Sequence, residues 1–83
     1  MSIKVFRKRL SIRSWRRGTK ELDLILGNFS DENLNGFQMY ELELYEQFLS
    51  NEDYLIYNWL FNKEESPRLF NSLVKRIQKG MNR

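Results

Sequence analysis

The sequence contains no cysteine and no histidine. Without cysteine the chain has neither a disulfide framework nor a thiolate zinc site, and the absence of cysteine fits a reducing compartment. Without histidine it lacks the usual imidazole base and the commonest transition-metal ligand. Catalysis would have to rest on carboxylates, a lysine, tyrosines or a borrowed cofactor. We therefore expect a protein that is not an enzyme and has no catalytic or metal-binding residues.

Long apolar segments are missing as well. No apolar run approaches the roughly 20 residues of a membrane-spanning helix, so we expect no membrane insertion. The first fifteen residues also lack the continuous apolar core of a secretory signal. Residues 1–20 are basic and free of acids, as an organellar targeting segment would be. Cleavage after them would cut through the glycine junction described below, so we assign them to the mature protein.

The net charge of +3 conceals a separation of charge along the chain. Residues 1–20 hold eight basic residues and no acid, residues 21–62 hold nine acids and no base, and the remainder is basic again. Such blocks predict a folded domain with oppositely charged faces. A basic helix beside a tryptophan could also bind nucleic acid, and a small nucleic-acid-binding or regulatory protein is our alternative. The acidic residues of 21–62 and the lack of a recognised nucleic-acid-binding motif argue against this alternative. We therefore expect no nucleic acid as a partner.

Apolar residues recur at helical spacing, and no segment alternates as a strand would. We expect a first helix capped by Ser2 that ends at Gly18, and a second helix capped by Thr19. Residues 30–36 read as a loop or a frayed turn, and Gly27 would permit a close contact between helices. The residues expected to face the core are Ile3, Phe6, Leu10, Ile12, Leu22, Leu24, Ile25, Leu26, Phe29, Met39, Leu42, Tyr45, Phe48, Leu49, Leu55, Ile56, Trp59, Leu60, Leu69, Phe70, Leu73, Val74 and Ile77.

Three further helices are expected in the second half of the chain. One spans about 38–49, and a shorter one within 50–62 is capped near Ser50 or Asn51. The last begins at Pro67, which suits the first helical position, and runs to about Lys79 before Gly80. The sequence therefore predicts an all-α fold, a compact bundle of four to five short helices forming a single domain over residues 1–83.

The stretch "SWRRGTKELDL" (14–24) joins the basic block to the acidic one. If Gly18 breaks the helix, Arg17 and Glu21 project from either side of a tight corner. Arg17 is a planar five-donor fork, Glu21 only accepts when ionised, and glycine lets another backbone approach. The corner is either a helix cap with solvated charges or a docking surface for a partner. The residues alone leave both interpretations open.

Two stretches carry a resemblance to a known family. "RRGTKELDLILG" (16–27) resembles the Arg-Gly-x-x-Glu signature of the SdhE family of succinate dehydrogenase assembly factors, with leucine and aspartate following at Leu22 and Asp23. "YNWLFN" (57–62) resembles the family's aromatic-x-Trp element, with Asp53 shortly before it. The chain departs from the family's Asp-Pro-Asp-Leu pattern at Tyr54, Leu55 and Ile56. Without the family's proline and second acid, a partner contact at these positions would differ from the one that the family makes. The corner at Arg17, Gly18 and Glu21 is unchanged.

The resemblance implies a maturation factor rather than an enzyme. Such a factor binds the flavoprotein subunit of succinate dehydrogenase, or of fumarate reductase in bacteria, and promotes covalent attachment of FAD to a histidine of that subunit. The family also implies a location in the bacterial cytoplasm, or in the mitochondrial matrix of a eukaryote. We expect a monomer when free and no permanently bound cofactor, since Gly18 alone is not a glycine-rich phosphate loop.

The resemblance also assigns roles to residues. Arg17 would donate paired hydrogen bonds into the flavoprotein, and Gly18 would allow a close backbone approach. Glu21 would accept from a partner arginine or amide, or orient Arg17. The residues expected to contact the partner are Arg17, Gly18, Glu21, Arg16, Asp23 and Trp15. Those expected to support the corner from within the bundle are Asp53, Tyr57 and Trp59.

Overall fold

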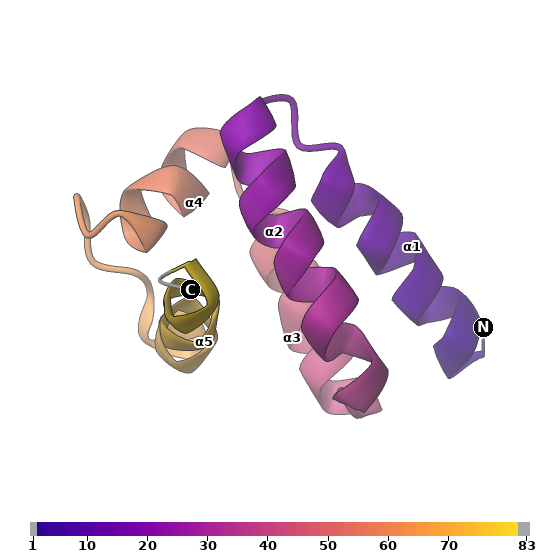
Figure 1. Ribbon diagram of the computed structural model, residues 1–83. Helices are drawn as coiled ribbons and strands as arrows, with labels where there is room; N and C mark the ends of the chain where they lie inside the picture. Colours follow the sequence, from indigo (N-terminus) through magenta and orange to yellow (C-terminus); the bar gives the residue numbers. More distant parts are fainter. Residues whose placement is uncertain (1, 82–83) are drawn as a thin grey trace.

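The computed structural model describes residues 2–81, which form helices and connecting turns. Helices α1 and α2 lie side by side and antiparallel, α3 packs behind them, and α4 and α5 form the other side of the bundle (Figure 1). The predicted all-α bundle is confirmed. The elements are α1 (Ile3–Trp15), α2 (Lys20–Asn33), the 3-10 turn η1 (Leu34–Gly36), α3 (Met39–Leu49), α4 (Asp53–Leu60), the 3-10 turn η2 (Arg68–Phe70) and α5 (Asn71–Met81).

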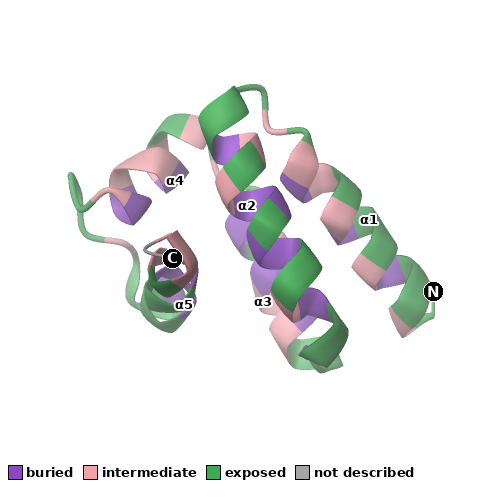
Figure 2. Ribbon diagram, viewed as in Figure 1, coloured by how far each residue is buried: buried purple, intermediate pink, exposed green. Residues whose placement is uncertain are grey.

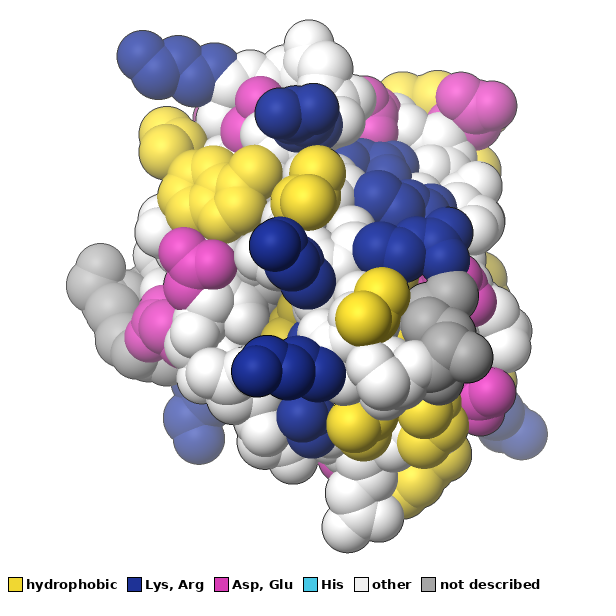
Figure 3. Space-filling view, turned by 90° about the vertical axis from the view of Figure 1, so that its right-hand side faces the viewer, with side chains coloured by type: hydrophobic (Ala, Val, Ile, Leu, Met, Phe, Trp, Pro, Cys, Tyr) yellow, Lys and Arg dark blue, Asp and Glu magenta, His cyan; other side chains and the backbone are white. Residues whose placement is uncertain are grey.

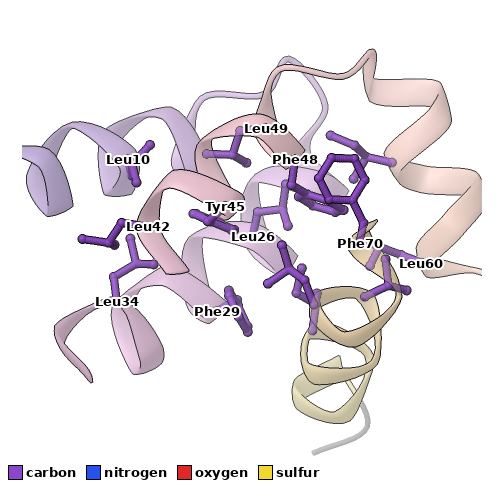
Figure 4. Close-up of a cluster of buried hydrophobic side chains, with 14 of the residues drawn as sticks. Leu10, Leu26, Phe29, Leu34, Leu42, Tyr45, Phe48, Leu49, Leu60 and Phe70 are labelled. Carbon is purple, nitrogen blue, oxygen red and sulfur yellow. The ribbon is translucent and has the colours of Figure 1, made fainter. Parts of the chain in front are cut away.

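Helix α3 supplies the centre of the core. Its Tyr45 and Phe48 are fully buried, and Figure 4 shows them among leucines and phenylalanines from the surrounding helices. The Phe48 ring lies 6.0 Å from Trp59 and 5.5 Å from Phe70, so aromatic contacts join α3 to α4 and to the turn before α5. Such edge-to-face and tilted pairs add about 0.5–1.5 kcal/mol each beyond the area that they bury.

Four residues that were expected to face the core are exposed instead. Ile12 and Leu24 are each 46% exposed, Met39 is 40% and Leu69 is 58%. Helices α1 and α2 carry apolar residues on more than one face, and periodicity alone does not say which face meets the bundle. Figure 2 shows buried residues where α1 and α2 face each other and exposed ones on their outer sides.

Several helix boundaries differ from the sequence-based expectation. Helix α1 ends at Trp15 rather than Gly18, because the backbone leaves the helical region at Arg16 (φ −128°, ψ 58°). Residues 30–36 are not a loop: α2 continues to Asn33 and η1 follows. The Ser30 hydroxyl donates to the Gly27 carbonyl at 2.8 Å, so this polar side chain is satisfied inside the helix. The expected cap of α2 is confirmed, with the Leu22 amide donating to Thr19 Oγ1 at 3.3 Å.

The later boundaries shift by a few residues. Helix α4 has Glu52 at its N-cap instead of Ser50 or Asn51. Pro67 precedes η2 rather than the helix itself, so α5 begins at Asn71 and passes Gly80 to end at Met81. Proline fits before a short 3-10 turn because it has no amide hydrogen to satisfy there.

Gly27 provides the close contact between helices that its position predicted. A Cβ placed on it would overlap the indole ring of Trp15, which packs against the α2 backbone. The Trp15 ring is held there by its Nε1, which donates to Asp31 Oδ1 at 3.3 Å. Helices α1 and α2 can therefore approach this closely only with glycine at position 27.

Replacing Gly27 with alanine is expected to destabilise the protein by about 1–2 kcal/mol. Overpacking typically costs about 1–3 kcal/mol, which exceeds the gain of up to about 1 kcal/mol in helix propensity. Urea unfolding measures the difference. Gly36→Ala is the matched control, because nothing lies within 4 Å of a Cβ at that position. Equal stabilities of the two variants would contradict this packing argument.

Among residues 2–81, Tyr45 is the titratable side chain that makes a polar contact at the centre of the core. Its hydroxyl contacts the hydroxyl of Ser14. The Ser14 hydroxyl donates to the Leu10 carbonyl at 2.7 Å, so at the 2.6 Å contact between the two hydroxyls Tyr45 is the donor. Burial is the main cause that raises the pKa of Tyr45 well above its usual range.

The free energy of unfolding should therefore fall as the pH rises above about 10. There an unfolded tyrosine loses its proton while the folded Tyr45 keeps it, so the folded state binds more protons and loses stability with pH. We expect Tyr45→Phe to be about 1 kcal/mol less stable than the parent at pH 8 and to lose this disadvantage at higher pH. Chemical denaturation across pH tests this, and a pH-independent difference would contradict it.

Candidate functional site

The corner between α1 and α2, residues 16–19, has a fixed and unusual backbone. Gly18 has φ +107°, a conformation that residues with a side chain rarely adopt. The backbone amide of Arg17 donates to the carboxylate of Asp23, and Thr19 caps α2. The corner is therefore held on both sides of the glycine.

The guanidinium of Arg17 fastens this corner to the connection between α3 and α4. Its Nε donates to Asp53 Oδ1 at 3.0 Å, its Nη1 to the Leu49 carbonyl at 2.6 Å, and its Nη2 to the Asn51 carbonyl at 2.9 Å. Nη2 also lies 2.9 Å from Asp53 Oδ1. The last carbonyls of a helix have no partner within it and carry partial negative charge. Arg17 therefore caps the C-terminal end of α3 from outside.

Arg17 is largely enclosed by these contacts. Its side chain is 11% exposed, and its three nitrogens donate within the fold. Within the fold, Arg17 therefore positions the corner.

Asp53 lies directly against the glycine as well as against Arg17. A Cβ placed on Gly18 would lie 3.4 Å from Asp53 Oδ2, which is ordinary van der Waals contact. Space for one methyl group is thus available, and the left-handed backbone is what favours glycine. A long side chain at position 18 would project over the surface formed by the corner.

The six expected contact residues fall into two groups. Arg16, Gly18 and Glu21 are exposed and surround the top of α2, whereas Trp15, Arg17 and Asp23 are half-buried with their polar atoms bound within the fold. We call the exposed group, together with Thr19 and Lys20, the corner surface. It forms the exposed turn at the top of Figure 2.

The three expected supporting residues lie on α4 at different distances from the corner. Asp53 contacts it directly. Trp59 is buried against Phe48 and Phe70, and Tyr57 stacks on Phe61 with ring centroids 4.5 Å apart. The Trp59 contacts fix α4 against α3 and η2, and α4 in turn carries Asp53.

The departure from the family pattern changes one exposed position. Tyr54 is 65% exposed next to Asp53, whereas Leu55 packs partly against the core and Ile56 is buried in it. Tyr54 therefore adds an exposed aromatic side chain directly after Asp53, the residue that contacts the corner.

A groove starts at Glu21 and continues between α2 and α5. It encloses about 450 Å³ and is lined mainly by apolar side chains, among them Leu24, Ile25, Phe61 and Met81. Within residues 2–81 no group of three metal-ligating side chains occurs. In the same range no helix has the length and apolar character that a bilayer crossing requires.

Comparison with known proteins points to one family. The family model described as "Flavinator of succinate dehydrogenase" matches residues 8–81. The "FAD assembly factor SdhE" of Coxiella burnetii is 35% identical over 65 residues, which cover 76% of this chain and 78% of that protein.

Eukaryotic relatives match as well. "Succinate dehydrogenase assembly factor 2, mitochondrial" is 35% identical over 75 residues in Dictyostelium discoideum, covering 90% of this chain and 53% of that protein. The protein of the same name in Arabidopsis thaliana is 32% identical over 81 residues, covering 90% and 43%. The chain thus spans about half the length of these relatives. No solved structure matches it.

Proposed function

The chain belongs to the family of flavinators of succinate dehydrogenase, and we propose that it binds the flavoprotein subunit of that enzyme and promotes covalent attachment of FAD to it. The observation that carries the proposal is the corner surface. An exposed glycine with φ +107° follows Arg17, whose three guanidinium nitrogens each donate within the fold. Such a surface allows a partner backbone to come close without ordering a flexible loop first.

We propose that the factor itself performs no chemistry. The flavin and the histidine that receives it belong to the flavoprotein, and FAD supplies the reactive ring when it is bound there. Binding energy at the corner surface would hold the flavoprotein so that histidine and flavin meet in a reactive orientation. Proximity of this kind accelerates a reaction without an added acid or base.

Each corner residue has a part in this proposal. Gly18 admits the partner's backbone, and Glu21 accepts hydrogen bonds from a partner cation or amide. Arg16 offers an exposed guanidinium at the edge. Arg17 and Asp53 keep these groups in place from beneath.

The client is succinate dehydrogenase or, in a bacterium, fumarate reductase. The matched relatives are named for succinate dehydrogenase and for FAD assembly, which favours the first. The relatives from eukaryotes are mitochondrial by name, so a eukaryotic source would place this chain in the matrix and a bacterial source in the cytoplasm. We propose a monomer as the free form.

The proposal is tested by expressing the flavoprotein with and without this protein. Flavin that remains on the flavoprotein in a denaturing gel, seen by its fluorescence and normalised to stained protein, measures covalent attachment. We expect a strong signal only when this protein is present. Equal signals with and without it would refute the proposed function.

Tyr54 is expected to contribute to partner binding through its exposed ring beside Asp53. Interface hot spots are rich in tyrosine, and truncation of one typically costs about 1–2 kcal/mol or more. Tyr54→Ala should therefore weaken flavoprotein binding about tenfold, measured by titration of the purified proteins. Tyr40→Ala is the control, because Tyr40 and Tyr54 are similarly exposed, at 67% and 65%. Tyr40 lies at the start of α3, whereas Arg17 binds the other end of that helix. Equal affinities of the two variants would exclude Tyr54 from the interface.

A further inference from the structure

The side of α1 that points away from the bundle combines cations with exposed aliphatic side chains. Val5 is 51% exposed and Ile12 is 46% exposed. Figure 3, which faces α1, shows hydrophobic side chains set among several Lys and Arg side chains. We call this side the outer α1 face, and it consists of the exposed residues Lys4, Val5, Lys8, Arg9 and Ile12.

The two aliphatic residues are not part of the core stripe. Phe6, Leu10 and Ser14 are the buried residues of α1, at helical spacing on one side. At about 100° per residue, Val5 and Ile12 fall on the opposite side, two turns apart. A helix on the surface of a globular protein usually carries polar residues there. Helix α1 therefore has a second apolar element that the bundle does not use.

Two basic residues of α1 do not belong to the outer α1 face. Arg7 donates to the carbonyls of Leu34 and Phe37 at 2.9 and 2.8 Å, and Arg13 lies 3.9 Å from Glu46. These two side chains turn toward the bundle. The cations of the outer face are all exposed, and no acid belongs to α1.

Two acids from neighbouring helices contact α1. Asp31 accepts from Trp15 and lines a hollow together with Lys4 and Lys8, and Glu46 pairs with Arg13. These two acids offset only part of the charge of the five basic residues of α1. The nine acids of residues 21–62 lie outside α1. An anionic surface would therefore attract the molecule by α1 first, and the separation of charge would orient it.

We propose that the outer α1 face docks reversibly on the surface of an anionic lipid bilayer. Helix α1 would lie parallel to the membrane, with the cations against lipid phosphates and with Val5 and Ile12 entering the boundary between headgroups and acyl chains. Docking would hold the corner surface, which follows α1 directly, beside the bilayer. This inference goes beyond the proposed function and does not depend on it.

Charge complementarity and the aliphatic residues together favour lipid over nucleic acid. Phosphate contacts on nucleic acid draw on cations and hydrogen-bond donors, and an exposed isoleucine adds nothing to them. Aliphatic side chains gain only by leaving water for an apolar phase. Two such residues are few, so docking should be weak and lost at high salt.

Sedimentation with lipid vesicles tests the proposal on the full chain. We expect binding to phosphatidylcholine vesicles containing about 30% phosphatidylglycerol, little binding to phosphatidylcholine alone, and loss of binding in about 0.5 M salt. Ile12→Ser should lower the affinity for the anionic vesicles about tenfold without changing any charge. The matched control is Leu24→Ser, since Leu24 is also 46% exposed but lies on α2 beside the groove.

A charge pair of variants completes the test. Lys8→Glu should weaken vesicle binding, whereas Lys75→Glu, an exposed lysine of α5, should weaken it much less. Absence of binding to the anionic vesicles at low salt would overturn the proposal. So would equal affinities of Ile12→Ser and Leu24→Ser. Duplex DNA provides a last test. If DNA bound tightly, competed with the vesicles and bound Ile12→Ser as well as the parent protein, the proposal would be overturned in favour of a surface that binds polyanions in general.

Discussion

Replacing Arg17 with alanine should destabilise the protein by about 2–4 kcal/mol, a large fraction of the about 5–15 kcal/mol that stabilises a typical folded protein. The change removes the donors to Asp53 and to the carbonyls of Leu49 and Asn51. The Asp53 side chain is only 33% exposed, so its charge would be left partly desolvated and unpaired. We place the loss below the full value for a buried pair because of this partial exposure. Urea unfolding measures it.

Lysine at position 17 should recover only part of the loss. The lysine ammonium keeps the charge. It lacks the planar fork with which arginine reaches all three acceptors, namely Asp53 and the carbonyls of Leu49 and Asn51. Arg13→Ala is the control, because Arg13 and Glu46 are 39% and 44% exposed and 3.9 Å apart, and such surface pairs contribute about 1 kcal/mol or less. A double-mutant cycle with Asp53→Asn isolates the pair. If Arg17→Ala were no more destabilising than Arg13→Ala, the positioning role would be wrong.

Replacing Glu21 with alanine should reduce covalent flavin attachment at least tenfold while leaving stability unchanged within about 0.5 kcal/mol. Glu21 is exposed, so the fold loses little when it is truncated. A partner donor, by contrast, would be left without its acceptor in a desolvated contact. The in-gel flavin signal, normalised to flavoprotein, measures the effect.

The control for Glu21 is Glu43→Ala, which removes an exposed carboxylate from α3. It should leave the flavin signal at the parental level. Gly18→Arg should abolish the signal by a different route, since its side chain would project over the corner surface and its backbone would be strained. A full signal from Glu21→Ala would remove Glu21 from the interface.

These predictions separate two functions of the corner that the sequence joins in one motif. We expect Arg17 to act on stability first and on binding through it. We expect Glu21 to act on binding alone. The left-handed glycine at position 18 and the cap at Thr19 could be predicted from the sequence, because both depend on local backbone preferences. Arg17 and Glu21 were indicated by the resemblance to the family.

The acceptors of Arg17 could not be predicted in the same way. Two of them are backbone carbonyls more than thirty residues away. Every residue has a backbone carbonyl, so the residue types at these positions do not indicate which carbonyls accept from Arg17. The outward direction of Ile12 was missed for a related reason. Where a helix is apolar on two sides, only its tertiary partners decide which side is covered.

Reconstitution from purified components shows directly whether the corner surface promotes flavin attachment. Apo-flavoprotein and FAD are mixed with the parent protein, with Glu21→Ala or with no factor, and covalent flavin is followed over time by fluorescence in denaturing gels. We expect rapid attachment with the parent protein and the same slow attachment in the other two mixtures. Equally slow attachment in all three would show that this chain does not promote flavin attachment, and equal acceleration by parent and variant would show that the factor acts without its corner.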